Sequence, residues 1–303
     1  MDDKVCVLLA AYNGAEFIQE QLDSILKQVD VLLDIYVSLD LSNDKTFDII
    51  LDYQNRYSNI YFLSYGEKYG SAGKNFFHLL RTVDFSCYDF ISFADQDDIW
   101  LTHKLSTSIK LIKEFGSDAY SGNVVAFWPN GKRRLIKKDC EQVEFDYLFE
   151  SAGPGCSFVL KGKLACEIKN TLNEKLEDIN NLWLHDWFCY SFARSNGFKW
   201  HIGSEPLMLY RQHDNNQVGA SKGVGALISR AKVILNGEGF EKVVQQSKFL
   251  GQNELPIQLI NSGSVLSLLK LASIARNCRR KNSEKILFVF ALLLLSIKKV
   301  LKA

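Results

Sequence analysis

A run of acidic side chains, Asp95–Asp98 (Asp-Gln-Asp-Asp), follows the apolar segment Phe90–Ala94. Carboxylates this close repel one another unless a cation or hydrogen-bond donors compensate their charge. Hard divalent cations such as Mg²⁺ or Mn²⁺ take oxygen ligands, and substrate phosphates can complete their coordination. The run therefore predicts a cation site, although an Asp-rich turn or a helix N-cap before Ile99 fits the same spacing.

Two residues far downstream could complete a catalytic site. His213 follows a short apolar segment, and its imidazole could ligate the same cation, although a lone histidine is also compatible with a surface or capping role. Asp186 stands between His185 and Trp187 at the start of a predicted helix, where it could serve as an N-cap. It could also act as a general base for an acceptor hydroxyl, beside the aromatic residues Trp183 and Trp187.

The elements that must position these residues alternate in type along the first part of the chain. Val5–Ala11 is apolar throughout, as expected of a strand buried on both faces. Further strands are predicted at Ile35–Ser38, Ile60–Ser64 and Phe90–Ala94, and helices at Ala15–Lys27, Phe47–Tyr57 and Lys74–Val83. This alternation predicts a doubly wound α/β fold with a mostly parallel sheet. Such sheets bind ligands beyond the carboxyl ends of their strands, where the polar segments 12–13, 38–44 and 95–98 fall.

The remaining sequence is less regular. A turn signal at residues 129–131 (Pro-Asn-Gly) separates Val124–Trp128 from Lys132–Ile136 and predicts a hairpin. Strands are also expected at Ser157–Leu160 and Leu207–Tyr210, and helices at Trp183–Ser195, Val265–Ala275 and Ile286–Ile297. From about Gly223 onward the sequence is helical and basic in character.

Other polar residues near the strand ends suit a nucleotide. Asp40 follows the second strand and could accept a hydrogen bond from the imide N–H of a base. Lys74 and Asn75, after two glycines, could lie near a diphosphate, although they equally fit an ordinary loop and helix start. No Ser-His-Asp order is visible, and no predicted strand leads into a Gly-x-Ser-x-Gly elbow. No glycine-rich phosphate loop follows the first strand, which argues against a dinucleotide-dependent dehydrogenase.

Composition limits the remaining possibilities. The chain has 303 residues, enough for one large α/β domain and an appendage. A formal net charge of +1 gives no reason to expect a nucleic-acid partner. Seven cysteines without a Cys-x-x-Cys pair fit buried thiols in a reducing compartment. The N-terminal residues lack the charge pattern of a signal peptide, so we expect a cytoplasmic protein.

Taken in order, these motifs closely resemble those of the family 2 glycosyltransferases with the GT-A fold. The resemblance runs from Val5 to about Ala220. It is carried by residues 11–14 (Ala-Tyr-Asn-Gly), Asp40 with 42–46, 74–76 (Lys-Asn-Phe), 95–100 (Asp-Gln-Asp-Asp-Ile-Trp), 185–187 (His-Asp-Trp) and 210–213 (Tyr-Arg-Gln-His). Within that family the sequence looks most like bacterial polysaccharide rhamnosyltransferases, which take L-rhamnose from dTDP-rhamnose to build O-antigen, capsule or rhamnan on a lipid carrier.

The resemblance implies a role for each motif. The metal, Mg²⁺ or Mn²⁺, would be held by Asp97, Asp95 and His213. The nucleotide sugar would meet Ala11, Tyr12, Asn13, Asp40, Lys74, Asn75, Asp95 and Gln96. The acceptor side would be lined by Gly153, Gly155, Cys156, His185 and Trp187. Asp186 would be the general base of a single in-line displacement that inverts the anomeric centre.

One motif departs from the family pattern. Residues 39–42 read Leu-Asp-Leu-Ser where such sequences usually read Asp-Asp-Gly-Ser. Asp40 is kept, but the changed neighbours Leu39 and Leu41 leave two alternatives open: a different donor, such as UDP-glucose, UDP-galactose or a UDP-N-acetylhexosamine, and a non-catalytic nucleotide-sugar or glycan-binding protein. The presence of both a metal site and a candidate base argues against the second.

The C-terminal part predicts a membrane surface as a partner. Ile286–Ile297 is too short for the roughly 20 residues of a spanning helix, and basic residues flank it on both sides. A core helix of a helical cap is the alternative. We therefore expect a GT-A domain at 1–222, with a nucleotide-binding half (1–100) and an acceptor half (101–222), and a membrane-associating region at 223–303. The protein would lie on the inner face of a bacterial cell membrane, where a lipid-linked glycan acceptor is met.

Overall fold

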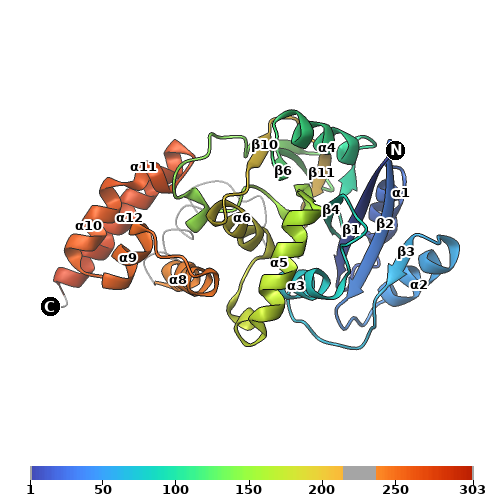
Figure 1. Cartoon of the computed structure of the whole chain (residues 1–303), viewed down its shortest axis with the longest axis horizontal. Helices are drawn as coiled ribbons and strands as arrows, with labels where there is room; N and C mark the ends of the chain where they lie inside the picture. Colours follow the sequence, from blue (N-terminus) through green and yellow to red (C-terminus); the bar gives the residue numbers. More distant parts are fainter. Residues whose placement is uncertain (1, 214–236, 302–303) are drawn as a thin grey trace. The chain divides into compact units, whose positions relative to one another are not determined.

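The computed structural model describes residues 2–213 and 237–301 (Figure 1). Within these residues the chain forms two compact units. The first contains the chain up to Asp139, Ala152–Ile179 and the described chain from Leu184 onward to residue 213, and the second contains Cys140–Ser151, Asn180–Trp183 and the described chain from residue 237. The predicted boundary between residues 222 and 223 lies outside the described residues and stays a prediction. No sequence signal anticipated that two short segments of the first 222 residues would join the second unit.

A seven-stranded sheet forms the centre of the first unit, in the order β10-β6-β9-β4-β1-β2-β3 (Figure 1). Its strands are β1 (Asp3–Ala11), β2 (Val31–Leu39), β3 (Ile60–Phe62), β4 (Phe90–Asp95), β6 (Ala119–Gly122), β9 (Val159–Lys161) and β10 (Trp200–Gly203). β1 pairs in parallel with β2 and β4, whereas β9 is antiparallel to β4 and β6. The predicted α/β fold with a mostly parallel sheet is therefore confirmed.

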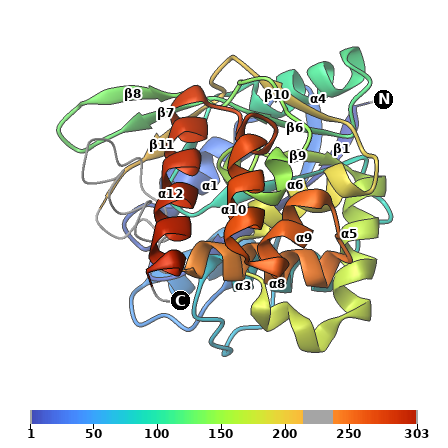
Figure 2. The same cartoon turned by 90° about the vertical axis from the view of Figure 1, so that its left-hand side faces the viewer.

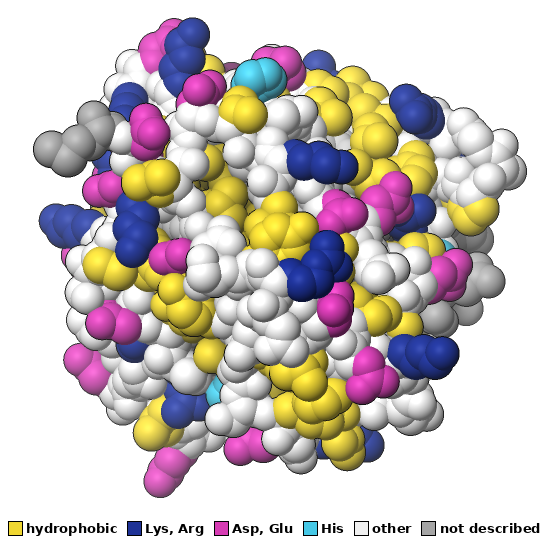
Figure 3. All heavy atoms as spheres, turned by 90° about the vertical axis from the view of Figure 1, so that its right-hand side faces the viewer, with side chains coloured by type: hydrophobic (Ala, Val, Ile, Leu, Met, Phe, Trp, Pro, Cys, Tyr) yellow, Lys and Arg dark blue, Asp and Glu magenta, His cyan; other side chains and the backbone are white. Residues whose placement is uncertain are grey.

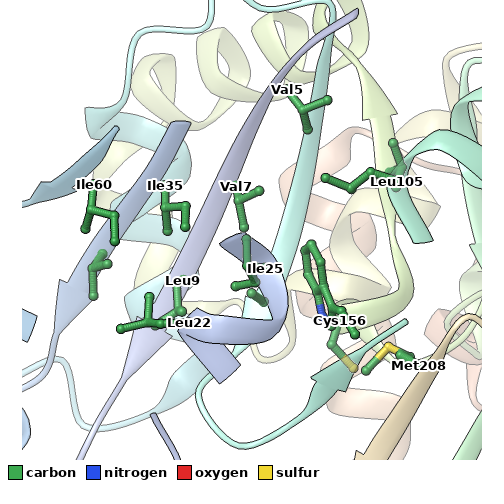
Figure 4. Close-up of a cluster of buried hydrophobic side chains, with 14 of the residues drawn as sticks. Val5, Val7, Leu9, Leu22, Ile25, Ile35, Ile60, Leu105, Cys156 and Met208 are labelled. Carbon is green, nitrogen blue, oxygen red and sulfur yellow. The ribbon is translucent and has the colours of Figure 1, made fainter. Parts of the chain in front are cut away.

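The central strand β1 explains why the sheet is stable. Its residues from Val5 to Leu9 are completely buried, because helices cover both faces of a parallel sheet. Figure 4 shows Val5, Val7 and Leu9 on one face of β1, near apolar side chains of the neighbouring strands and of α1. Burying one such side chain contributes roughly 1.5–3 kcal/mol. The apolar run thus fixes the position of β1, and with it the polar segments at its carboxyl end.

Six α-helices accompany this sheet. They are α1 (Ile18–Leu26), α2 (Thr46–Arg56), α3 (Ala72–Thr82), α4 (Lys104–Glu114), α5 (Gly162–Glu174) and α6 (His185–Ser195). The helix predicted from Lys74 begins earlier, at Ala72, because the hydroxyl of Ser71 caps it by accepting the Lys74 N–H at 3.3 Å. The helix predicted from Trp183 begins at His185. The sequence reading missed α4, α5, β6 and β10.

A second, four-stranded sheet has the order β5-β11-β7-β8. Its strands are β5 (Ile99–Trp100), β11 (Met208–Arg211), β7 (Val124–Phe127) and β8 (Arg133–Ile136). The predicted hairpin is confirmed, since β7 and β8 pair antiparallel around a turn with Gly131 at φ 80°. The strand predicted at Ser157–Leu160 is partly wrong: a short 3₁₀ turn at Gly155–Ser157 precedes β9. Two further 3₁₀ segments lie at Asp146–Leu148 and Leu176–Asn181.

The second unit is helical in its described part. Its helices are α8 (Glu238–Leu250), α9 (Leu255–Ser262), α10 (Val265–Ser273), α11 (Ala275–Cys278) and α12 (Asn282–Val300). α10 and α12 run side by side, with Leu268, Leu271, Phe288 and Leu292 in a shared core (Figure 2). α12 has 19 residues and is longer than predicted. Across residues 2–213 and 237–301, no helix combines the length and apolarity needed to cross a bilayer.

Charge on the surface is mixed. On the face drawn in Figure 3, acidic and basic side chains are interspersed, with apolar side chains between them. The formal net charge of +1 agrees with this pattern. A broad field of one sign, as a phosphate backbone would require, is absent from this face.

Candidate active site

Acidic side chains gather at the carboxyl end of β4. Asp95 is partly buried, whereas Asp97 is 7% exposed and Asp98 is completely buried. The ligand atoms of Asp95, Asp98 and Cys156 all lie within 4.8 Å of one another. The backbone N–H of Arg211 donates to Asp98 Oδ1 at 3.0 Å. This bond ties the end of β11 to the acidic run.

β11 also brings a histidine to this place. His213 Nε2 lies 2.6 Å from Oδ2 of Asp97, although the two residues are 116 positions apart in sequence. Both side chains are mostly buried, with 18% and 10% of their side-chain surface exposed. An imidazole and a carboxylate oxygen thus face each other at the edge of the sheet, as expected of two ligands of one cation.

The electrostatics of the cluster favour a positive partner. Burial, the charge of Asp97 and the charge of Asp186 together raise the pKa of Asp95 to about 7. Burial and the charges of Asp97 and Asp95 raise the pKa of Asp98 well above its usual value. Such shifts arise where like charges are crowded together away from water. The donor set of carboxylate oxygens and one imidazole nitrogen fits a divalent cation such as Mg²⁺ or Mn²⁺.

The candidate base lies at the start of α6. Asp186 is in the first turn of this helix, and its Oδ1 accepts the backbone N–H of Trp187 at 2.6 Å. A carboxylate is stabilised there by the positive end of the helix dipole. A Cβ on Gly155 would lie 3.2 Å from Asp186 Cβ, and the ligand atoms of the adjacent Cys156 and of Asp95 lie within 4.8 Å of each other. Asp186 therefore lies beside the turn that contacts the acidic run, and its role as the base stays a prediction.

The neighbouring His185 is held very differently. Its ring stacks on Phe76 with centroids 3.8 Å apart and packs edge-on against Phe93. Among the described residues, neither ring nitrogen has a hydrogen-bond partner. Burial lowers the pKa of His185 to about 3, so the imidazole is neutral. A Cβ on Gly155 would lie 2.4 Å from Nε2, which explains the glycine at this position.

The other residues predicted on the acceptor side lie around the same turn. Cys156 is completely buried, with its thiol near Asp95 and Asp98 rather than on the surface. Trp187 is 7% exposed. A Cβ on Gly153 would meet Ser157 Oγ at an ordinary 3.5 Å. Contact of these residues with an acceptor stays a prediction.

The loop after β1 is tied to the loop after β2. The backbone N–H groups of Asn13, Gly14 and Ala15 donate to side-chain oxygens of the second loop, at 3.0, 2.8 and 3.0 Å; the acceptors are Ser42, Thr46 and Asp44. Asn13 has a φ of 43°, and its Oδ1 accepts the N–H of Asn43. These bonds explain why the second loop is rich in short polar side chains.

Gln96 joins the first of these loops to the acidic run. Its side-chain amide donates to Tyr12 O at 2.9 Å and accepts the Tyr12 N–H at 2.8 Å. The Tyr12 ring itself is 55% exposed. Gln96, predicted to contact the nucleotide, therefore positions the loop that carries an exposed aromatic ring.

Asp40 is 4% exposed and surrounded by backbone amides. Oδ1 accepts the N–H groups of Leu41 and Tyr69, both at 2.8 Å, and Oδ2 accepts that of Gly70 at 2.7 Å. The carboxylate thus folds the segment before α3 back onto the end of β2. Contact with a base through a remaining lone pair stays a prediction.

Lys74 and Asn75 lie on opposite sides of the first turn of α3. Lys74 is exposed, whereas Asn75 is 2% exposed. The Asn75 amide donates to Ala11 O at 3.3 Å and to Ser38 O at 3.1 Å, which holds the ends of β1 and β2. Among the described residues, Asn75 Oδ1 has no partner. Lys74 therefore remains the candidate for a diphosphate contact.

The structure thus brings together most of the predicted residues. Asp97 and His213 meet in the acidic run, Asp186 lies beside the Gly155 turn that contacts this run, and the segments at 11–13, 40 and 75 meet beside the end of β1. The sequence reading missed Ser42, Asp44 and Thr46 as loop supports. It also gave no signal that Cys156 would lie near Asp95 and Asp98 at the end of β4.

Comparisons with known proteins agree with this geometry. The family model described as Glycosyl transferase family 2 matches residues 6–158. The chain is 39% identical to the dTDP-rhamnosyl transferase RfbG of Shigella flexneri, over 95% of this chain and 100% of that protein. It is 27% identical to the UDP-Glc:alpha-D-GlcNAc-diphosphoundecaprenol beta-1,3-glucosyltransferase WfgD of Escherichia coli, over 53% of this chain and 61% of that one.

Solved structures share the fold. The chain resembles S. aureus TarS 1–349 in complex with UDP, with a TM-score of 0.55 and 17% sequence identity. The match covers 97% of this chain and 88% of the TarS chain. It therefore extends through both compact units.

Proposed function

This chain belongs to glycosyl transferase family 2, and on that premise we propose that it transfers L-rhamnose from dTDP-L-rhamnose to a hydroxyl of a lipid-linked glycan. One observation carries the choice of donor: the 39% identity to a dTDP-rhamnosyl transferase, which extends over 100% of that protein. Identity of this extent spans the nucleotide loops, the acidic run and the C-terminal helices together. The acceptor would belong to a polysaccharide such as an O-antigen, a capsule or a rhamnan.

A divalent cation, Mg²⁺ or Mn²⁺, would be held by Asp97, Asp95 and His213. When bound, it would offset the negative charge that grows on the departing nucleotide diphosphate. The crowding of three carboxylates beside one imidazole supports this assignment, because like charges this close together favour a positive partner. Lys74, exposed at the first turn of α3, would add a second positive charge near the diphosphate.

Asp186 would act as the general base. Its carboxylate would accept the proton of the acceptor hydroxyl while the hydroxyl oxygen forms a bond to the anomeric carbon. The bond from that carbon to the diphosphate oxygen would break at the same time, and its electron pair would leave with dTDP. Attack from the face opposite the leaving group inverts the anomeric centre, so no covalent enzyme intermediate is required. The position of Asp186 beside the turn that contacts Asp95 supports this role.

Tyr12 and the loops that follow β1 and β2 would hold the nucleotide. Tyr12 offers an exposed ring on which a base could stack, and Asp40 lies in the loop fastened to it. Leu41, which replaces the usual glycine, is 49% exposed and directly follows Asp40. An apolar side chain at this position suits the methyl group of thymine.

The C-terminal helices would bring the enzyme to its acceptor at the inner face of a bacterial membrane. One face of α12 exposes apolar side chains at helical spacing: Ile286, Phe290, Leu293, Ile297 and Val300 are 71%, 56%, 40%, 55% and 61% exposed. Lys298 and Lys299 occupy its last turn, where they could meet anionic lipid headgroups. Replacing Ile286 and Phe290 by serine should reduce sedimentation with anionic vesicles, and unchanged binding would remove this face as the attachment site.

A second candidate donor is a UDP-hexose or a UDP-N-acetylhexosamine. It is favoured by the likeness to WfgD, whose name specifies UDP-Glc, and by the altered loop at residues 39–42. A non-catalytic nucleotide-sugar-binding protein would retain the loops but would have no use for Asp186 beside a cation site.

The deciding experiment offers the purified full chain a panel of nucleotide sugars with Mg²⁺ or Mn²⁺ and an extracted lipid-linked acceptor. We expect dTDP-L-rhamnose alone to be consumed efficiently, and only when the cation is present. Efficient turnover of a UDP-sugar would replace the donor assignment. The Asp186→Asn variant should bind the donor normally yet lose transfer, whereas wild-type transfer rates would exclude Asp186 as the base.

A further inference from the structure

The imidazole ring of His213 contacts an aromatic side chain as well as the Asp97 carboxylate. It stacks on the ring of Phe17, with centroids 5.2 Å apart and planes 24° from parallel. Phe17 lies immediately before α1, in the segment that follows the nucleotide loop. A flat aromatic side chain therefore covers one face of the imidazole whose Nε2 points at the Asp97 carboxylate.

Arg211 lies on the same aromatic ring. Its guanidinium carbon is 4.7 Å from the centroid of Phe17 and 4.6 Å from that of Phe127, so two aromatic rings contact the guanidinium. Its Nε donates to the backbone oxygen of Asp97 at 2.7 Å, and its NH2 group forms an ion pair with Glu20. The Arg211 side chain thus contacts α1, β7 and the acidic run, and Arg211 is only two positions before His213.

We propose that Phe17 and Arg211 are positioning residues that hold the His213 imidazole in place for the cation. This inference rests on the proposed metal site. His213 follows the end of β11 by two residues, so its position depends on contacts beyond the strand. Groups that orient a metal-ligating histidine typically set the metal affinity by 10- to 100-fold. The Phe17 stack fixes the plane of the ring, and Arg211 fixes the distance of this chain segment from Asp97.

The chemistry of the two side chains fits this task. A guanidinium is planar and weakly hydrated, so it can contact two aromatic faces while its N–H groups point at a carbonyl and a carboxylate. A lysine ammonium could form the ion pair but could not also fill the space between two rings. The proposal therefore predicts that Arg211→Lys weakens Mn²⁺ binding even though it keeps the positive charge.

The test measures Mn²⁺ binding to the full-length protein by following free Mn²⁺ in electron paramagnetic resonance titrations. Phe17→Leu keeps apolar volume but removes the flat ring, and we expect it and Arg211→Lys to weaken Mn²⁺ binding about 10-fold. In the transfer reaction both variants should need correspondingly more Mn²⁺ for half-maximal rate and recover kcat at saturating Mn²⁺. A general loss of structure would lower kcat at every Mn²⁺ concentration.

A matched control exists elsewhere in the first unit. Phe115 stacks on His201 with centroids 4.1 Å apart and planes 12° from parallel, in a pair outside the acidic site. Phe115→Leu should leave Mn²⁺ affinity unchanged. Unchanged affinity in both Phe17→Leu and Arg211→Lys, beside a clear loss in His213→Ala, would overturn the positioning role alone. Wild-type affinity in His213→Ala would overturn the metal site itself.

Discussion

The carboxyl ends of β4 and β2 each carry buried aspartates, yet the two regions are built in opposite ways. At β2, the Asp40 carboxylate accepts three backbone N–H groups, and the charge is satisfied by the fold itself. At β4, Asp95, Asp97 and Asp98 face one another and an imidazole, and the pKa of Asp95 rises to about 7. The same residue type therefore shapes a loop in one region and forms a crowded acidic cluster in the other, because its partners differ.

The largest expected effect comes from the acidic run. Asp97→Asn keeps the shape of the side chain but removes a charged cation ligand, and we expect kcat/KM for transfer to fall about 1,000-fold, the size of a several-kcal/mol loss. Donor-dependent turnover with Mn²⁺ measures this change. Asp40→Asn should leave Mn²⁺ affinity unaltered. Equal loss of Mn²⁺ binding in both variants would erase the distinction between the two regions.

The next effect concerns stability. Asp40→Ala strips the Tyr69 and Gly70 N–H groups of their acceptor, so the free energy of unfolding should fall by about 2–3 kcal/mol. Urea unfolding at constant pH measures this difference. Asp97→Asn is the comparison, because relief of like-charge crowding should leave its stability equal to or above that of the wild type. An Asp40→Ala protein as stable as the wild type would contradict the assigned role of this carboxylate.

A smaller effect appears in the pH dependence of the chelated protein. Burial and the charge of Asp97 raise the pKa of Asp95 from its ordinary value of 3.8 to about 7, so the folded state holds this proton more tightly than the unfolded state does. Stability contributed by the protonated carboxyl is therefore lost as pH rises from about 4 to 7, by about 1.4 kcal/mol per pH unit. Asp95→Asn should remove this slope from unfolding curves recorded at pH 5 and pH 6. Parallel slopes for the two proteins would show that Asp95 is charged at both values.

The smallest effect tests the changed loop at β2. If Leu41 contacts the thymine methyl, Leu41→Ala should reduce the preference for dTDP over dUDP by about fourfold, since one buried methyl group contributes roughly 0.8 kcal/mol. Calorimetric titration with both nucleotides measures the ratio. Leu32→Ala, at another exposed leucine of the same strand region, is the control. If Leu41→Ala leaves the ratio of dTDP to dUDP affinity unchanged, Leu41 does not contact the thymine methyl group.

The central strands and the acidic run could be predicted from the sequence, because they depend on residue types that are close together in the chain. The apolar run from Val5 to Leu9 predicts a strand buried on both faces, and the acidic run after β4 predicts a cation site. Alternating elements then place the polar segments at one edge of a parallel sheet. The family motifs in their order led to the same enzyme class as the family model.

Other features depended on contacts between segments far apart in the chain. Spacing cannot show that Arg211 would lie between Phe17 and Phe127, that Cys156 would reach Asp98, or that His185 would be buried against Gly155. The sequence by itself determined the buried strands β1, β2 and β4, the acidic run and the family, because these follow from residue type and local order. Only the tertiary structure decided which aspartates are satisfied and which are crowded, because hydrogen-bond partners and burial are set by how distant segments pack.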